Sequence, residues 1–247
     1  MTRLLGAELF KLRTTRTFYG LTGGCVALVL LIVVLASALG NPGPNEPVMR
    51  NLMGLAGLAQ AFALVLGVLA ITTEFRDGTI TPTLLVVPRR TRLLLAKLGA
   101  SALTGLVLGL VTTAAVALIV AGITSARDID DNATTSQVVH MVVGGTLAVG
   151  LFALIGLGLG AIVRNQVGAI IGALVYMLIV EPLSNLIPTF GDWVGKYGLG
   201  GTSGALSQTS GGDNVLSQVP GGLLLAAYAA ILLVIGIVLV NQRDVSA

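Results

Sequence analysis

Charged side chains are scarce in this chain. Only 10% of its 247 residues are Asp, Glu, Lys or Arg, whereas a soluble domain carries about 25%. The mean hydropathy is +0.95, and several apolar runs are long enough to cross a bilayer. The composition excludes an ordinary soluble domain and places the chain in a membrane.

The groups that carry catalysis and cofactor chemistry are also scarce. Cys25 is the one cysteine and lies in an apolar run, so the chain can form neither an internal disulfide nor a cysteine cluster. His140 is the one histidine and sits at the edge of an apolar run, where a structural role at the interface is expected. No metal-ligand spacing, no Gly-x-Ser-x-Gly elbow and no phosphate-binding P-loop occurs. We therefore expect no enzyme activity, no metal and no cofactor in this chain. We also expect no nucleic-acid binding, because the basic residues do not form one soluble basic domain.

Six windows are long and apolar enough to cross about 30 Å of hydrocarbon. They cover residues 18–39, 52–73, 98–123, 138–163, 167–187 and 220–240. The fourth and fifth are separated only by "RNQ", which predicts a tight antiparallel hairpin. The predicted fold is an all-α polytopic membrane protein that forms a single transmembrane domain over residues 1–247.

The basic residues predict the orientation, because Lys and Arg concentrate in cytoplasmic loops. With six spans, one set of loops holds 11 of the 14 basic residues, and both termini belong to that set. We therefore expect both termini to be cytoplasmic. The larger set is Arg3, Lys11, Arg13, Arg16, Arg76, Arg89, Arg90, Arg92, Lys97, Arg164 and Arg243, and the smaller set is Arg50, Arg127 and Lys196.

Glycines recur inside the spans at a spacing of four residues. Gly156 and Gly160 form one such pair, and Gly168 and Gly172 form another. This spacing puts both glycines on one helix face and lets another backbone approach closely. The favoured interpretation is packing of the fourth and fifth helices within the chain, and a subunit interface is the alternative.

Glu181, in "LIVEPLSNLIP", is the one carboxylate inside a predicted span. A buried charge in a membrane is costly and marks a candidate functional residue. Pro182 follows and is expected to break or kink the helix. Two interpretations remain: the helix ends early and Glu181 meets water, or Glu181 belongs to a polar re-entrant element that lines a pathway.

The loop between the second and third spans holds the densest cluster of charge. Glu74, Arg76 and Asp77 follow the second span, and Gly78 can supply a turn. Thr81 is a suitable N-cap for a short apolar helix of about six residues that begins at Pro82, and Pro88 ends it. A helix this short is not stable alone. It therefore either docks in a groove of a partner that supplies energy or rests on lipid at the membrane interface.

The loop resembles that of ABC-2 type permeases, the membrane subunits of a class of ABC exporters. The stretch "TTEFRDGTITPTLLVVPRRTRLLLAKL" over residues 72–98 carries the resemblance. "GAELFKLRTTRTF" over residues 6–18 resembles their N-terminal connecting helix, with an apolar stripe at Leu5, Leu9 and Leu12 whose edges Glu8 and Arg13 blur. "NQRDV" over 241–245 resembles their C-terminal ending. The residues matching the loop pattern are Glu74, Arg76, Gly78, Thr79, Leu84, Leu85, Pro88, Arg89, Arg90 and Lys97.

The resemblance implies a transport subunit of a prokaryotic plasma-membrane exporter. The short loop helix would be a coupling helix that docks on a separate ATPase subunit, which binds ATP and Mg²⁺. Two ATPases and two permease copies would form the transporter, and Glu74 and Arg76 would transmit motion from loop to span. A re-entrant segment would lie before the sixth span. The spans would line the pathway with apolar side chains and offer no charged recognition groups, which favours a hydrophobic or amphipathic solute such as a drug, peptide or lipid-like molecule. Two other functions remain as alternatives to an exporter subunit: a self-sufficient secondary carrier or channel, and a membrane enzyme or scaffold.

Overall fold

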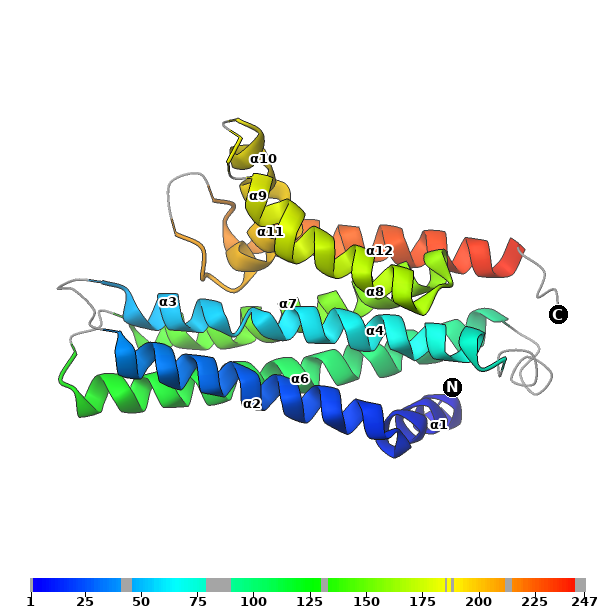
Figure 1. Cartoon of the computed structure of the whole chain (residues 1–247), viewed down its shortest axis with the longest axis horizontal. Helices are drawn as coiled ribbons and strands as arrows, with labels where there is room; N and C mark the ends of the chain where they lie inside the picture. Colours follow the sequence, from blue (N-terminus) through cyan, green and yellow to red (C-terminus); the bar gives the residue numbers. More distant parts are fainter. Residues whose placement is uncertain are drawn as a thin grey trace.

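The chain is helical almost throughout in the computed structural model shown in Figure 1. The structure describes residues 2–40, 46–78, 90–129, 133–184, 186–187, 189–211 and 215–242, and no strand occurs among them. The helices in chain order are α1 (Thr2–Thr14), α2 (Arg16–Leu39), α3 (Val48–Leu55), α4 (Leu58–Arg76), α6 (Arg90–Ala126), α7 (Thr135–Val163), α8 (Gln166–Val175), the π-helical turn η1 (Tyr176–Val180), α9 (Glu181–Ser184), α10 (Phe190–Tyr197), α11 (Leu199–Leu206) and α12 (Gln218–Gln242).

Six helical segments are long and apolar enough to cross a membrane, which confirms the number predicted from the sequence. The second combines α3 and α4 across a turn at Ala56 and Gly57 and begins four residues earlier than predicted. The fifth combines α8, η1 and α9. The six segments are Arg16–Leu39, Val48–Arg76, Leu94–Ala126, Thr135–Val163, Gln166–Ser184 and Gln218–Val240.

Helix α7 forms the centre of the bundle and packs against α4, α6 and α12. In its most apolar window 61% of the residues are buried, against 17% in the fifth span. Glycine makes this packing possible, because a side chain at Gly156 would collide with the backbone of Leu64 in α4, and one at Gly67 with the backbone of Ala153 in α7. The first glycine pair therefore packs inside the chain, as the favoured interpretation predicted.

The second glycine pair does not follow that prediction. A Cβ at Gly172 would meet no atom within 4 Å, and one at Gly168 would touch only the neighbouring side chain of Asn165. The reason is the position of α8, which leaves this face against open space rather than against another helix.

The predicted hairpin between the fourth and fifth spans is present. Arg164 ends α7 in the left-handed conformation, with φ +55°, and its N–H donates to the carbonyl of Gly160. Asn165 then caps α8 by accepting a hydrogen bond from the Gly168 N–H at 2.9 Å. Two residues thus reverse the chain.

The two ends of the bundle differ in their elements and their charge (Figure 1). At one end lie α1, the α7–α8 turn and the C-terminal ends of α4 and α12; we call it the α1 end. At the opposite end, the α11 end, lie α3, α10 and α11. The basic residues with described side chains divide as the topology predicted, with Lys11, Arg16, Arg76, Lys97 and Arg164 at the α1 end and Arg50, Arg127 and Lys196 at the other.

Candidate functional site

Four charged side chains meet at the α1 end and form what we call the ionic cluster: Glu8, Lys11, Glu74 and Lys97. The Lys97 Nζ lies 2.9 Å from Glu8 Oε2 and 2.8 Å from Glu74 Oε1. The Lys11 Nζ lies 3.2 Å from Glu8 Oε1 and 3.0 Å from Glu74 Oε1. The cluster is neutral overall and joins α1, α4 and α6 through side chains up to 89 positions apart.

The two lysines differ sharply in burial. The Lys97 side chain is 3% exposed, whereas that of Lys11 is 52% exposed. Lys97 also donates to the carbonyl of Ala70 at 3.2 Å, so three acceptors surround its ammonium group. A buried ammonium in this position is tolerated only because its partners are in place, and removing one partner of such a group typically costs about 3–5 kcal/mol.

The cluster also changes the acid–base behaviour of Lys11. Burial alone would lower the pKa of this lysine, but its hydrogen bond to Glu74 and the negative charges of Glu74 and Glu8 raise the pKa above its ordinary value of 10.5. Lys11 therefore stays positively charged at neutral pH. Glu74 Oε2 is buried and has no hydrogen-bond partner among the described residues, so the cluster leaves one acceptor unsatisfied.

The predicted loop residues separate into two environments. Glu74 belongs to the buried cluster, near the C-terminal end of α4. Arg76 instead pairs with Asp77 at 2.9 Å on the surface, where both side chains are exposed. Gly78 has φ +65°, a conformation that glycine adopts without strain, and the chain turns there.

The rest of the predicted coupling loop lies outside the described residues. This applies to Thr79, Thr81, Leu84, Leu85, Pro88 and Arg89. Arg90 opens α6, but its side chain is not described. The proposed roles of these residues stay predictions.

Sequence analysis did not assign Glu8 and Lys11 to a site. In the sequence Glu8 only interrupts the edge of an apolar stripe, but in the structure it lies on the buried face of α1 and pairs with Lys97. The available signal was the presence of Glu8 and Lys97 close to predicted span ends, since isolated charges at such positions require partners. The sequence alone could not show that they meet.

Arg164 ties the α7–α8 turn to two other helices at the α1 end. Its guanidinium donates to the carbonyl of Leu239 at 3.1 Å, near the end of α12. It also lies over the Phe75 ring, 5.2 Å from the centroid. A cation at a helix C-terminus is favourable there because the last carbonyls carry partial negative charge.

Glu181 occupies a buried position at the α11 end. Glu181 is only 9% exposed. Its Oε1 accepts a hydrogen bond at 2.6 Å from the N–H of Gly200, which lies in the first turn of α11. The interpretation that the helix ends early and Glu181 meets water is therefore wrong. Pro182 does not end the helix either, because the π-helical turn before it shifts the hydrogen-bond register and the helix continues to Ser184.

The family assignment comes from comparison with known proteins. No curated protein matches the chain. The family model described as "ABC-2 family transporter protein" matches residues 4–180, which include most of α1, the ionic cluster, the first four spans and the fifth span as far as η1. This match and the six apolar helices agree with the resemblance seen in the loop. The chain belongs to the ABC-2 family of transporter proteins.

Proposed function

We propose that the chain is the permease subunit of an ATP-driven exporter, which forms the translocation pathway as a dimer and is coupled to two separate ATPase subunits. Family membership implies an ABC ATPase partner, and six apolar helices support a multi-pass membrane position. The basic α1 end would face the cytoplasm of a prokaryotic cell, because basic residues favour that side. The ATPase would bind ATP and Mg²⁺, and this chain would bind neither.

The ionic cluster is the observation that carries the coupling mechanism. Residues 77–89 connect α4 to α6, and the ion pair between Glu74 and Lys97 holds these two helices together next to that connection. Glu8 adds α1 to the same unit. A displacement of the loop by an ATPase would therefore move α1, α4 and α6 together rather than bend one helix. Lys97 and Glu74 act in this proposal as positioning residues.

The middle of the bundle offers little support for a self-sufficient carrier. Such a carrier needs charged groups deep in its spans. Among the described residues, the polar groups in the adjoining middles of α6 and α7 are hydroxyls: Thr113 and Thr146 lie 3.2 Å apart, and each also bonds the backbone of its own helix. The buried charged residues Glu8, Glu74, Lys97 and Glu181 lie toward the two ends of the bundle.

Co-purification from membranes tests the proposal. The wild type should retain a soluble ATPase, and the variant Leu84→Asp/Leu85→Asp should lose it if this apolar segment docks on the ATPase. The matched control is Leu186→Asp/Ile187→Asp, an adjacent exposed apolar pair at the α11 end, which should keep the ATPase. If no ATPase accompanies the wild type, the carrier interpretation becomes the better one.

Glu181 provides a separate test of the pathway. We propose that α10 and α11 form a re-entrant element beside the exit, which Glu181 attaches to the fifth span. Glu181→Gln keeps an acceptor oxygen for the Gly200 N–H but removes the charge. Transport by a reconstituted complex should fall in this variant, and unchanged transport would remove Glu181 from the pathway.

A further inference from the structure

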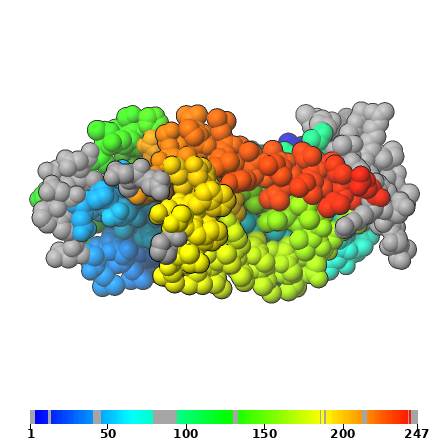
Figure 2. All heavy atoms as spheres, turned by 90° about the horizontal axis from the view of Figure 1, so that it is seen from above, coloured from blue at the N-terminus to red at the C-terminus, as the bar shows by residue number. Residues whose placement is uncertain are grey.

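A large cavity opens between α8 and α12. It has a volume of about 520 Å³, within the range of small-molecule sites. Helices α4 and α7 line its inner side through Leu64, Ile155 and Leu159, and α10 and α11 close one end. In the part of the chain described, α8 and α12 make almost no direct contact. Figure 2 looks down on this face, with α12 in red and α8 in yellow-green.

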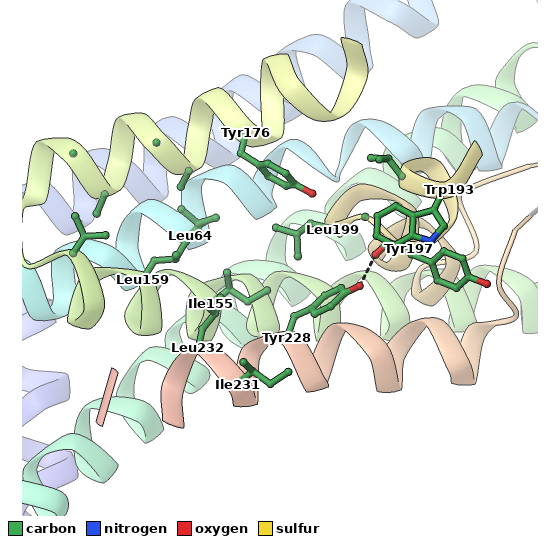
Figure 3. Close-up of a pocket in the computed structure, with 17 residues that line it drawn as sticks. Leu64, Ile155, Leu159, Tyr176, Trp193, Tyr197, Leu199, Tyr228, Ile231 and Leu232 are labelled. Carbon is green, nitrogen blue, oxygen red and sulfur yellow. Dashed lines mark hydrogen bonds between the residues drawn. The ribbon is translucent and has the colours of Figure 1, made fainter. Parts of the chain in front are cut away.

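Aromatic side chains concentrate in this cavity. The chain has four tyrosines and one tryptophan, and Tyr176, Tyr197, Tyr228 and Trp193 all line it. Figure 3 shows the rings of Tyr176 and Tyr228 reaching toward the same space from opposite sides, with Trp193 and Tyr197 beyond them. Tyr228 is fixed by a hydrogen bond from its hydroxyl to the carbonyl of Tyr197 at 2.7 Å. Aromatic residues are 4% of the chain, so this grouping is a strong local enrichment.

The cavity has two chemically different halves. One half is aliphatic, formed by Leu64, Ile155, Leu159, Ile231 and Leu232, which lie together on one side of Figure 3. The other half is the aromatic group. No charged side chain lines either half among the described residues. A ligand that fits both halves has an apolar body and a head group that aromatic rings can hold.

The charges near the aromatic half select the sign of that head group. The Glu181 carboxylate lies next to Gly198 and Gly200, and Gly198 lines the cavity. On α10, Asp192 is offset by Lys196, whose ammonium already lies over the Tyr197 ring at 5.7 Å. The formal charges of Glu181, Asp192 and Lys196 therefore sum to minus one, and ring faces attract cations.

We propose that this cavity binds an amphipathic cation, with its apolar body in the aliphatic half and its positive head between Tyr176 and Tyr228. Only the statement that such a cation is transported rests on the proposed function. Binding itself requires this chain alone, so the two can fail separately.

The single tryptophan makes the binding measurable. The permease would be placed in nanodiscs of phosphatidylcholine and titrated with tetraphenylphosphonium, a rigid lipophilic cation, while Trp193 fluorescence is recorded. Tetraphenylborate, which is similar in size but negatively charged, serves as the probe for charge selection. We expect saturable quenching by the cation and a much weaker saturable response to the anion.

Four variants test the Tyr176 ring, the Tyr176 hydroxyl, the general effect of replacing a tyrosine by leucine, and the charge of Glu181. Tyr176→Leu removes the ring and should weaken binding of the cation by roughly two- to thirtyfold, whereas Tyr176→Phe keeps the ring face and should stay within about twofold. Tyr19→Leu makes the same substitution in α2, at an exposed position outside the cavity, and should leave the affinity unchanged. Glu181→Gln should weaken binding of the cation without weakening that of the anion.

The inference is overturned if the cation gives no saturable quenching, if the anion binds equally well, or if Tyr176→Leu weakens binding no more than Tyr19→Leu or Tyr176→Phe. Retention of the wild-type elution profile by Tyr176→Leu shows that lost binding is local. If an ATPase co-purifies but tetraphenylphosphonium does not bind, the proposed function stands and this inference falls. If the cation binds but no ATPase is found, the reverse holds.

Discussion

Replacing Lys97 by methionine tests the ionic cluster most directly. The substitution keeps most of the volume of the side chain but removes the ammonium group, which lies 2.9 Å from Glu8 and 2.8 Å from Glu74. Two buried carboxylates then face each other with only the half-exposed Lys11 to compensate. Leaving such charges without their partner costs about 3–5 kcal/mol.

The cost should appear first in α1, because α1 is outside the predicted spans and is held to α6 partly by Glu8. Hydrogen exchange of the backbone amides of α1 measures this local opening. At about 1.4 kcal/mol for each tenfold change, exchange in Lys97→Met should be faster by roughly two to three and a half orders of magnitude.

Two variants make the result specific. Lys11→Met removes the other lysine of the cluster, whose side chain is 52% exposed. It should cost at most about 1 kcal/mol, or roughly fivefold in exchange, because exposed ion pairs contribute little. The double variant Glu8→Gln/Lys97→Met should recover much of the stability lost in Lys97→Met, because it also removes the unpaired negative charge of Glu8 on α1. Exchange in Lys97→Met no faster than in Lys11→Met would refute the argument that burial gives Lys97 its importance.

Three further predictions concern other contacts. Because the pKa of Lys11 is raised in the folded state, the stability that Lys11 contributes is complete below pH 10.5 and is lost as the pH rises through the folded-state pKa. The difference in stability between wild type and Lys11→Met should therefore vanish at high pH. A difference that stays constant with pH would contradict this. Gly156→Leu should lower the free energy of unfolding by about 1–3 kcal/mol, because the new side chain collides with the backbone of α4 and pushes α4 away from α7. Gly172→Leu, on a face with open space, should change the free energy of unfolding by no more than about 0.5 kcal/mol. Equal losses in the two variants would show that close packing is not the cause. Arg76→Ala should lower transport-coupled ATPase activity and leave membrane insertion intact, and unchanged activity would count against its role at the loop.

Hydropathy predicted the spans well because a bilayer imposes a minimum apolar length on every crossing. It could not predict which spans are buried. In the most apolar stretch of α12, the mean hydropathy is 3.0 and 22% of the residues are buried. In that of α7, the mean hydropathy is only 2.3, yet 61% of the residues are buried. Lipid is as apolar as a protein core, so the most hydrophobic helix can be the one that faces lipid. Close packing in α7 depends instead on small residues such as Gly156.

The charged sites were predicted only in part for a different reason. Glu74 and Lys97 were identified because they belong to a recognisable loop pattern, but Glu8, the second carboxylate that pairs with Lys97, lies 89 residues away in the sequence. Glu181 likewise bonds a backbone N–H 19 residues away. A local pattern shows that a buried charge needs a partner, but it does not show which residue the fold brings to it.

The distribution of polar contacts suggests where the bundle changes shape. The ion pair of Glu8 with Lys97 holds α1, which does not span the membrane, to α6. The hydrogen bond from the Gly200 N–H to Glu181 holds the short helix α11 to the fifth span. Between these points, α4, α6 and α7 pack closely through glycines, which resists deformation. The fifth span differs, with 17% of its window buried and a π-helical turn at Tyr176–Val180, a feature at which helices commonly bend. We therefore expect α8 to move against a rigid α4–α6–α7 core, which would change the width of the cavity that Tyr176 lines.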